Sequence, residues 1–363
     1  MEVCFAGDCN FISEVYGIPP ENIIKDRDLW KAEKKYINLE QAISENSIKT
    51  NKYMMYSGSE CIPYLKKMQI TGVSLANNHI HDKGTEGIVD TISNLDIAGI
   101  EHTGAGKNVA DASKPIKIDK NVYLLAFCDY GEKYLRNVKT ASKNDAGVNP
   151  YSINQVIKQL DELPMNSQAV IYIHWSIEYS WFVPQKCIED AKKILIHPKA
   201  GLLIGQHAHI PLGWLKVNDK YAFFSLGNFL FSNFCLYPPN NVQSSYCKEK
   251  KLPVVKIMMN VKKPVYKKWY FTNRISILVY YNTETGKVRT DYTIQDSDLP
   301  YIRRLKGVQK QFIRGWLVFL SILYRSHPIL YKMIFHLNLY GLYGIRKIKR
   351  GMVDIFYENS KKK

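Results

Sequence analysis

Short apolar runs recur along the first 230 residues of the chain, each ending in polar residues, and stretches with helical spacing lie between them. The runs that we expect to be strands are residues 2–6, 36–39, 72–75, 122–127, 169–173, 201–204 and 221–225. The stretches that we expect to be helices are residues 60–69, 85–95, 153–163 and 186–197. Strands and helices that alternate at these lengths predict an α/β fold whose sheet is buried on both faces.

Three further segments continue this region. Residues 252–261, 274–281 and 287–294 have the composition of strands, and the turn-like residues 282–286 join the last two. No Ser/Gly-rich linker and no internal repeat divides residues 1–300. We therefore predict that residues 1–300 form one domain.

Polar side chains follow five of the predicted strands at the point where each strand ends. They are Asp8, Glu40, the run Asn77-Asn78-His79, His174, and the pair His207 and His209. In open α/β sheets the loops at the carboxyl ends of the strands converge on one crevice, which is where ligands bind. Asp, Glu, Asn and His are ligands of Mn, Fe and Zn, and two such ions about 3.5–4 Å apart could share them.

Each of these residues alone has a more ordinary explanation. An aspartate after a strand is usually a cap or turn residue, paired asparagines commonly form turns, and a lone histidine is often a satisfied core residue. Their coincidence at five strand ends favours a metal site over five separate structural roles.

The charge of the chain is concentrated at its end. The formal net charge is +17, but residues 301–363 hold 14 Lys+Arg against 2 Asp+Glu, which leaves residues 1–300 nearly neutral. Within this tail, basic residues are interleaved with apolar ones at near-helical spacing. The apolar positions are Ile302, Leu305, Val308, Phe312, Trp316, Leu317, Leu320 and Leu323.

A basic amphipathic helical tail over residues 301–363 suits the surface of an anionic membrane. The alternative is a helix that packs on the body and leaves its charged face in water. A nucleic-acid partner is not expected, because the basic residues form no recognisable binding motif.

The chain carries no sign of export or of a membrane span. Its seven cysteines are scattered without CxxC spacing, which favours a reducing compartment. The longest largely apolar run, residues 316–324, is far short of the roughly 20 residues that a spanning helix needs. We expect a cytoplasmic protein that is associated peripherally with the inner face of the membrane.

Seven segments form a series along residues 1–231. They are FAGDCN (5–10), INLE (37–40), VSLANNHIHDKGTEGI (73–88), TGAGKN (103–108), IHWSIEY (173–179), IGQHAHIP (204–211) and FFSLGNFLF (223–231). In order and spacing this series resembles the CapA family of poly-γ-glutamate capsule biosynthesis proteins, within the calcineurin-like metallophosphatase superfamily. The pair ANNHxxDxG and SLGNFxF is the most specific part of the resemblance.

The resemblance implies a four-layered αββα sandwich with a dinuclear centre of Mn, Fe or Zn. The metal ligands that it implies are Asp8, Glu40, Asn78, His174, His207 and His209. His79 would act as the acid for the leaving group, with Asp82 orienting it, and Glu178 would orient His174. The residues expected to support the ligands are Asn10, Asn77, Glu178 and Asn228.

Three positions depart from the pattern of the superfamily or the family. Asn10 stands where the Asp-x-His opening normally has its histidine, Ser176 where Gly is common, and Gln206 where a further histidine is frequent. One histidine ligand is therefore replaced by an amide or lost, and a plausible site remains.

Two functions are compatible with these features. The first is a metal-dependent, phosphoesterase-like hydrolase that acts in capsule, exopolysaccharide or poly-γ-glutamate biosynthesis at the cytoplasmic membrane face. The second is a non-catalytic assembly protein that keeps the fold and tethers polymer synthase subunits to the membrane. The metal content of the purified protein distinguishes the two.

Overall fold

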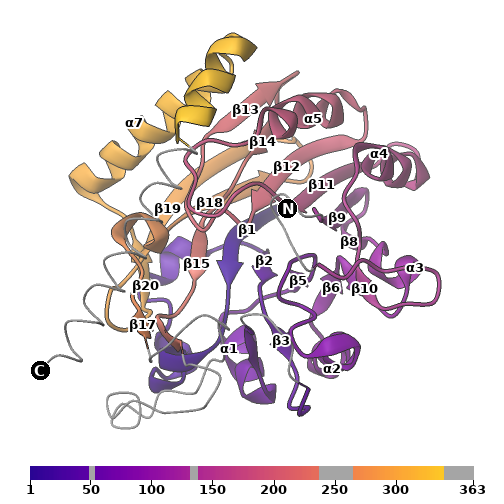
Figure 1. Ribbon diagram of the computed structural model, residues 1–363, viewed down its shortest axis with the longest axis vertical. Coiled ribbons are helices and arrows are strands. Elements are labelled where there is room, and N and C mark those ends of the chain that lie inside the picture. Colours follow the sequence, from indigo (N-terminus) through magenta and orange to yellow (C-terminus); the bar gives the residue numbers. More distant parts are fainter. Residues whose placement is uncertain (49–53, 131–137, 237–264, 339–363) are drawn as a thin grey trace, which may run out of the picture.

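The computed structural model describes residues 1–48, 54–130, 138–236 and 265–338 of the chain. These residues form a mixed α/β structure built around two large sheets, one of eight strands and one of six (Figure 1). The predicted α/β class is therefore confirmed.

The larger sheet has the order β20-β19-β18-β1-β2-β5-β6, and β15 pairs with β1. Its strands are β1 (Glu2–Cys9), β2 (Lys34–Leu39), β5 (Gly72–Ser74), β6 (Glu101–Thr103), β15 (Asn228–Leu230), β18 (Ile275–Asn282), β19 (Val288–Gln295) and β20 (Ile302–Arg304). The pairs among β1, β2, β5, β6 and β15 are parallel, whereas β18, β19 and β20 are added by antiparallel pairing. The loops that leave β1, β2 and β5 therefore start at the same edge of the sheet.

The second sheet has the order β13-β14-β12-β11-β9-β8. Its strands are β8 (Ile116–Asp119), β9 (Val122–Cys128), β11 (Gln168–His174), β12 (Ala200–Gln206), β13 (Trp214–Val217) and β14 (Lys220–Phe223). The four central strands run parallel, and antiparallel β8 and β13 close the two edges. The carboxyl ends of β11 and β12 consequently lie side by side.

Short ladders and helices complete the described residues. The ladders pair β3 (Ala42–Ile43) with β4 (Tyr56–Ser57), β7 (Ala105–Gly106) with β10 (Gly147–Val148), and β16 (Phe234–Leu236) with β17 (Val265–Lys267). The labelled α-helices are α1 (Ile62–Lys67), α2 (Gly84–Ala98), α3 (Val109–Ala112), α4 (Ile153–Glu162), α5 (Gln185–Ile196) and α7 (Gly307–Leu323), and residues 328–338 are helical as well. The 3-10 turns are η1 (Ser13–Gly17), η2 (Pro20–Asn22), η3 (Arg27–Trp30), η4 (Ser59–Cys61) and η5 (Phe271–Arg274).

Local sequence explains where α4 begins and which way it faces. The side chain of Ser152 caps the helix by accepting a hydrogen bond from the Gln155 amide, and Val156 and Leu160, four residues apart, form its buried stripe. Helices α4 and α5 lie together beside the six-stranded sheet, with α5 against β12, β13 and β14 (Figure 1).

Buried contacts from β11 and β12 hold the two sheets together. The Tyr172 hydroxyl on β11 donates to the Ala6 carbonyl on β1 at 3.2 Å, and its ring meets Phe5 edge-on at 5.9 Å. The Gln206 amide at the end of β12 also donates to the Ala6 carbonyl, at 3.2 Å. These contacts fix the carboxyl end of β12 against β1, so the strand ends of both sheets meet.

The predicted elements agree with the observed ones to within a few residues at each end, and only the strand predicted at residues 252–261 lies outside the described residues. Several short strands, β8 and β15 among them, were not predicted. They are short or follow a turn, so they carry little periodicity of their own.

The first part of the predicted tail packs on the body. β20 pairs with β19, Ile302 and Leu305 are fully buried, and α7 lies against β13 at the upper left of Figure 1. The Trp214 amide of β13 donates to the Ser321 hydroxyl of α7 at 2.8 Å. The chain therefore packs continuously across residue 300, and the division into two domains there stays a prediction.

Candidate metal centre

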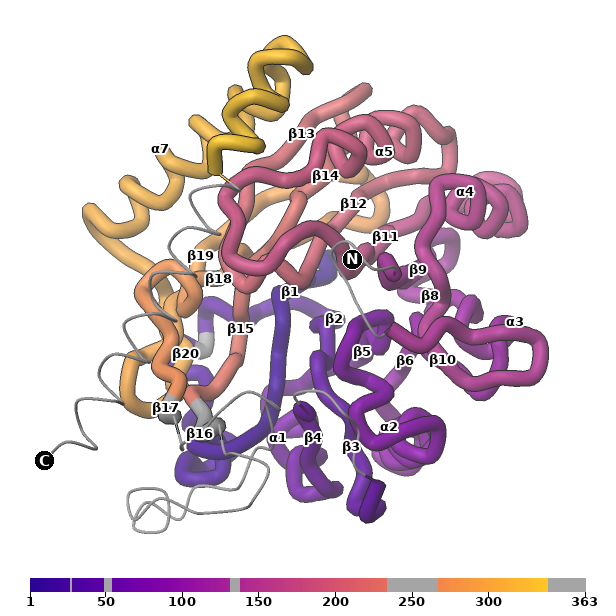
Figure 2. Tube along the Cα trace, in the orientation of Figure 1, coloured from indigo at the N-terminus to yellow at the C-terminus, as the bar shows by residue number. Residues whose placement is uncertain are grey.

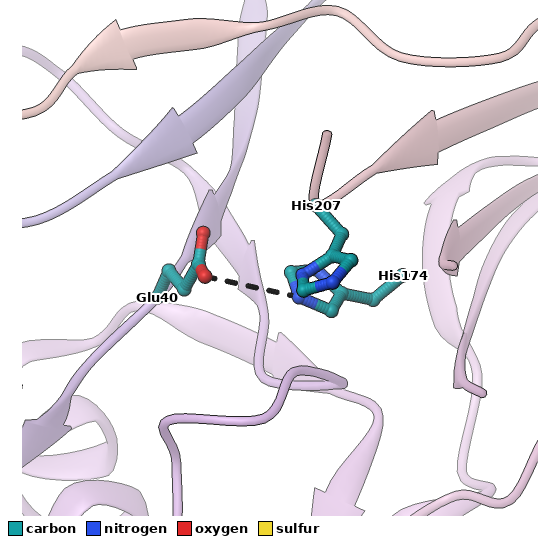
Figure 3. Close-up of side chains that lie close together, drawn as sticks. All are labelled: Glu40, His174 and His207. Carbon is teal, nitrogen blue, oxygen red and sulfur yellow. Dashed lines mark ion pairs between the residues drawn. The ribbon is translucent and has the colours of Figure 1, made fainter. Parts of the chain in front are cut away.

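Five of the six predicted metal ligands converge where the two sheets meet. All five are buried, and they are Asp8, Glu40, His174, His207 and His209. His174 Nε2 lies 3.8 Å from Glu40 Oε1, and the rings of His174 and His207 are 4.7 Å apart (Figure 3). The carboxylate comes from the end of β2 and the two imidazoles from the ends of β11 and β12, so each sheet supplies part of the cluster.

The ligand atoms form three overlapping triads. Within each triad the atoms lie within 4.8 Å of one another, which is close enough to share one ion. The triads are Glu40–His174–His207, Asp8–Glu40–His209 and Glu178–His207–His209. Because Glu40, His207 and His209 each belong to two triads, the three triads share ligands and form one continuous cluster.

Hydrogen bonds orient the ring of His209. Its Nδ1 lies 2.9 Å from the Asn228 Oδ1, and the Asn228 amide group donates to the Asn273 carbonyl at 2.9 Å. This second bond fixes which end of the Asn228 amide faces the ring, so His209 Nδ1 is the donor. Nε2 then presents its lone pair toward Glu40, whose Oε1 is 3.6 Å away.

Two asparagines hold His174 from opposite sides. Asn78 Oδ1 lies 2.9 Å from Nε2, and Asn38 Nδ2 lies 3.3 Å from Nδ1. Asn38 also donates to Asp8 Oδ1 at 2.8 Å. The predicted ligand Asn78 therefore contacts the cluster by its bond to His174. Asn38 connects Asp8 of one sheet with His174 of the other.

The two loops that carry the histidines have unusual backbone conformations. Four non-glycine residues there have positive φ: Ser176 (81°), Tyr179 (61°), His207 (88°) and His209 (55°). Such conformations cost on the order of 1–3 kcal/mol each and cluster at functional sites. Ser176 stands where the resembling family commonly has Gly, and its φ lies in the region that glycine adopts most readily.

A close approach of β15 to β1 brings Asn228 to the cluster. The Asp8 amide donates to the Gly227 carbonyl at 2.9 Å, and a Cβ on Gly7 would lie 1.8 Å from that carbonyl oxygen. Only glycine fits at position 7 with this spacing. The two strands run side by side in the trace despite their separation in sequence (Figure 2).

Burial keeps the site histidines neutral. Desolvation lowers the pKa of His207 to about 4 and that of His209 to about 3, and desolvation together with the neighbouring histidines holds the pKa of His174 well below its usual range. Neutral imidazoles are the form that binds metal ions. Desolvation raises the pKa of Asp8 to about 7, against the hydrogen bonds from Asn38 and His207.

Glu178 has the opposite balance. Burial acts to raise the pKa of its carboxyl group, but attraction to His207 and His209 in their protonated forms, to Lys267 and to His79 outweighs burial and lowers the pKa. The carboxylate form is therefore favoured beside the two loop histidines. Sequence analysis expected Glu178 to orient His174, whereas the structure places it in a triad with His207 and His209.

The predicted acid, His79, is paired with Asp82 as expected. His79 Nδ1 lies 2.6 Å from Asp82 Oδ2, and both side chains are buried. Asn77 ties the turn that carries His79 to the end of β2. Its Oδ1 accepts from the His79 amide at 3.0 Å, and its Nδ2 donates to the Leu39 carbonyl at 2.8 Å.

Asn10, like Glu178, differs from the supporting role predicted for it. Its side chain contacts Met55 Sδ at 3.6 Å and accepts from the Ser232 amide at 3.2 Å. Asn10 thus ties the end of β1 to the chain after β15 rather than to a metal ligand.

Three residues near the cluster were missed by sequence reasoning: Asn38, Asn273 and Lys267. Asn38 lies in the INLE segment, two residues before Glu40, and that position was a usable signal. Asn273 and Lys267 come after residue 231, beyond the segments that carry the family resemblance, and they have no local signal.

Comparisons with known proteins find a family and two relatives that this chain resembles. The family model "Bacterial capsule synthesis protein PGA_cap" matches residues 3–233. The "PGA biosynthesis protein CapA" of Bacillus subtilis (strain 168) is 30% identical over 199 residues, which are 53% of this chain and 49% of the relative. The "Capsule biosynthesis protein CapA" of Bacillus anthracis is 28% identical over 177 residues, 47% of this chain and 43% of the relative. The chain thus spans about half the length of the curated relatives it matches.

Proposed function

Because the chain belongs to the PGA_cap family of bacterial capsule synthesis proteins, we propose that it is a metal-dependent hydrolase of capsule, exopolysaccharide or poly-γ-glutamate biosynthesis. The reaction would be phosphoesterase-like. The observation that carries the proposal is the set of three ligand triads that share Glu40, His207 and His209. A purely structural cluster gains nothing from burying two acids and three neutral histidines together.

The finer fold assignment is part of the same proposal. Two sheets in contact, with α4 and α5 beside one of them, are compatible with a four-layered αββα metallophosphatase sandwich. The position of the ligands at the carboxyl ends of parallel strands from both sheets supports this assignment.

The residues of the cluster fit a divalent metal ion. Carboxylates and neutral imidazoles are the donors that Mn, Fe and Zn accept, and the buried His207 Nδ1 has no hydrogen-bond partner among the described residues. Asp8, Glu40 and His209 would hold one ion, and Glu40, His174 and His207 a second. Bound ions of this kind lower the pKa of a coordinated water and act as Lewis acids.

His79 and Asp82 would handle the proton of the leaving group. Asp82 accepts the Nδ1 hydrogen of His79, which leaves Nε2 as the atom that gives or takes a proton. Because Asp82 is fully buried, it holds the ring in one orientation. His79→Gln should therefore reduce turnover while leaving the metal content unchanged.

Elemental analysis of the purified protein, followed by a screen of phosphodiesters with Mn²⁺, tests the proposal. We expect at least one equivalent of a transition metal and metal-dependent cleavage that chelation abolishes. A folded protein that binds no Mn²⁺, Fe²⁺ or Zn²⁺ would contradict the hydrolase assignment.

A non-catalytic assembly protein is the second candidate, and the departures Asn10 and Gln206 from histidine favour it. In that case the protein would bind polymer synthase subunits, and the fold would matter more than the metal. Binding of synthase subunits that survives removal of the metal, together with no turnover, would support this function.

We also propose that the protein acts at the inner face of the membrane, with the outer face of α7 and residues 328–338 as the contact. Within the described part of the chain, none of the helices is both long enough and apolar enough to cross a bilayer. Nine of the fifteen exposed large apolar side chains in the described residues lie between positions 308 and 337. They are Val308, Phe312, Val318, Phe319, Ile322, Ile329, Leu330, Met333 and Leu337.

The opposite side of α7 is already packed. Ile313, Leu317 and Leu320 are buried on the body, so the helix is apolar on both sides, which is typical of a helix with a second partner. Four of the eight positions that the sequence grouped on one membrane face, Ile302, Leu305, Leu317 and Leu320, face the interior instead.

Charge favours an anionic membrane over a second copy of the chain as the occupant of this surface. Residues 301–338 contain seven Lys or Arg and no Asp or Glu; four of the seven pair with acids of the body, and the remaining three are Arg314, Arg325 and Lys332. A two-fold contact between copies would bring these like charges together, whereas anionic lipid complements them.

Flotation with anionic vesicles at 0.1 M and 1 M salt tests the membrane contact. Point variants are preferable to truncation at residue 300, because truncation would remove β20 from the sheet. We expect Phe312→Ser with Phe319→Ser to abolish flotation, whereas Ile97→Ser, at a position 84% exposed on α2, should leave it intact. Flotation that is unchanged in the double variant would exclude this surface.

A further inference from the structure

A lysine lies beside the metal centre, against the rings of Tyr179 and Trp269, which together are called the aromatic wall. Lys267, at the end of β17, donates from Nζ to the Tyr179 hydroxyl at 2.7 Å. The same Nζ lies 4.1 Å from the centre of the Trp269 ring and 5.1 Å from that of Tyr179. The ammonium group is therefore positioned by one hydrogen bond and two aromatic faces.

The wall reaches the ligands directly. The rings of Tyr179 and Trp269 each lie 5.8 Å from the ring of His209, the Tyr179 ring stacked on it. Trp269 is buried and anchored, because its indole N–H donates to the Ser232 carbonyl at 2.9 Å and its amide donates to Asn233 Oδ1 at 3.0 Å. Lys267 is thus one side chain away from a predicted ligand.

A fixed positive charge in this place has an electrostatic cost. Divalent ions held by the triads would be repelled by the ammonium, because like charges interact strongly where burial lowers the effective dielectric. Glu178, the acid in the triad beside this wall, provides one negative charge, which a bound ion would also use. An anion lying between the ions and Lys267 would offset the repulsion on both sides.

The neighbouring hydroxyl fits the same ligand. A hydroxyl that accepts a hydrogen bond from an ammonium group becomes a stronger donor itself. Tyr179 also has a positive φ of 61°, and its amide donates to the Ala208 carbonyl, between the two loop histidines, at 2.9 Å. The strained backbone therefore holds the hydroxyl next to the loop that carries His207 and His209.

We propose that Lys267 and Tyr179 form a subsite for an oxyanion, a phosphate or carboxylate group of the substrate, at the edge of the metal centre. The subsite rests on the proposed function for its place beside the reacting bond. It narrows the substrate class to molecules with an anionic group at or next to the bond that is cleaved.

Binding of inorganic phosphate and of acetate, measured by calorimetry on the protein with and without Mn²⁺, tests the subsite. One lost charge-assisted hydrogen bond corresponds to a loss of about ten- to a hundredfold in affinity. We expect Lys267→Met to weaken binding of the preferred anion by this factor. Lys267→Arg should restore most of it, and Tyr179→Phe should weaken it less than Lys267→Met does.

The adjacent lysine is a matched control. Lys268 is half exposed and pairs with Asp298 at 2.7 Å on the surface, so Lys268→Met changes the net charge equally without touching the wall. Anion affinity equal to wild type in Lys268→Met and reduced in Lys267→Met supports the subsite. Equal affinities in all variants, or no binding of either anion by the wild-type protein, overturns it.

Metal content and turnover separate this inference from the proposed function. If the metal-loaded protein cleaves no ester but phosphate binding depends on Lys267, the hydrolase assignment fails and the subsite remains. If the protein cleaves an ester with the same KM in wild type and Lys267→Met, the subsite fails and the hydrolase assignment remains. The preference for phosphate or for acetate identifies which anion the subsite recognises.

Discussion

Replacing Glu40 by glutamine should uncouple metal binding from folding. Glu40 is fully buried, and its Oε1 lies 3.8 Å from His174 Nε2 and 3.6 Å from His209 Nε2. Glutamine has the same shape but is a poor metal ligand. In the metal-free protein it replaces an acid that lies among neutral imidazoles near a second acid, Asp8, so we expect Glu40→Gln to melt at or above the wild-type temperature.

The increase in melting temperature that a bound metal ion gives the wild-type protein can be calculated from the length of the chain. An ion at a hundred times its dissociation constant stabilises the folded state by about 2.7 kcal/mol. For 363 residues the entropy of unfolding is about 0.8 kcal/mol per degree, so the melting temperature should rise by about 3–4 °C. Because Glu40 belongs to two of the three triads, Glu40→Gln should lose most of this increase.

Thermal melts with EDTA or with Mn²⁺, combined with elemental analysis, measure this directly. Glu162→Gln is the control, since Glu162 is exposed on α4 with only a 3.8 Å ion pair to Lys158, and it should keep the full metal-dependent increase. An unchanged metal-dependent increase in Glu40→Gln would refute the assignment of the ligands. A lower melting temperature in EDTA would refute the argument that the buried acid destabilises the metal-free protein.

Three further expectations concern the site. His207→Ala removes a ligand from two triads, so bound metal should fall at least about tenfold while the circular dichroism spectrum stays that of the wild type. In EDTA, the free energy of unfolding should fall by about 2–3 kcal/mol per pH unit as the pH drops from 6 to 5. The three site histidines, whose pKa is lowered in the folded state, take up protons only on unfolding, whereas Asp8, whose pKa is raised to about 7, offsets one of them. Equal urea midpoints at pH 7 and 5.5 would contradict this balance. Gly7→Ala should lower the free energy of unfolding by about 3 kcal/mol or prevent folding, because the added Cβ would meet the Gly227 carbonyl. Gly17→Ala is the control: position 17 has open space around it, so chemical denaturation should find its stability close to that of the wild type.

Much of the site was predictable because a parallel sheet has a defined edge. Asp8, Glu40 and His174 are recognisable as strand-end residues from apolar runs of a few residues, and parallel pairing then brings such positions together. The same local patterns predicted the helices, because capping and a buried stripe depend on residues within one or two turns. These features need no knowledge of distant parts of the chain.

The remaining site residues depend on contacts between segments far apart in sequence. Asn228 reaches His209 only because β15 pairs with β1, and that pairing requires Gly7 more than 200 residues earlier. Lys267 and Asn273 reach the cluster from the chain beyond residue 231, where no periodicity marks them. Their positions result from packing, which local propensity does not encode.

The tail shows the same division most clearly. Its sequence alone predicted a basic amphipathic helix within residues 301–363, and showed that the longest largely apolar run, residues 316–324, is too short to span a bilayer. Which apolar residues face the interior was decided by β13, where Trp214 bonds to Ser321 and where Leu317 and Leu320 are buried. A helix with apolar residues on both sides has two possible buried faces, and only the surface against which it packs selects between them.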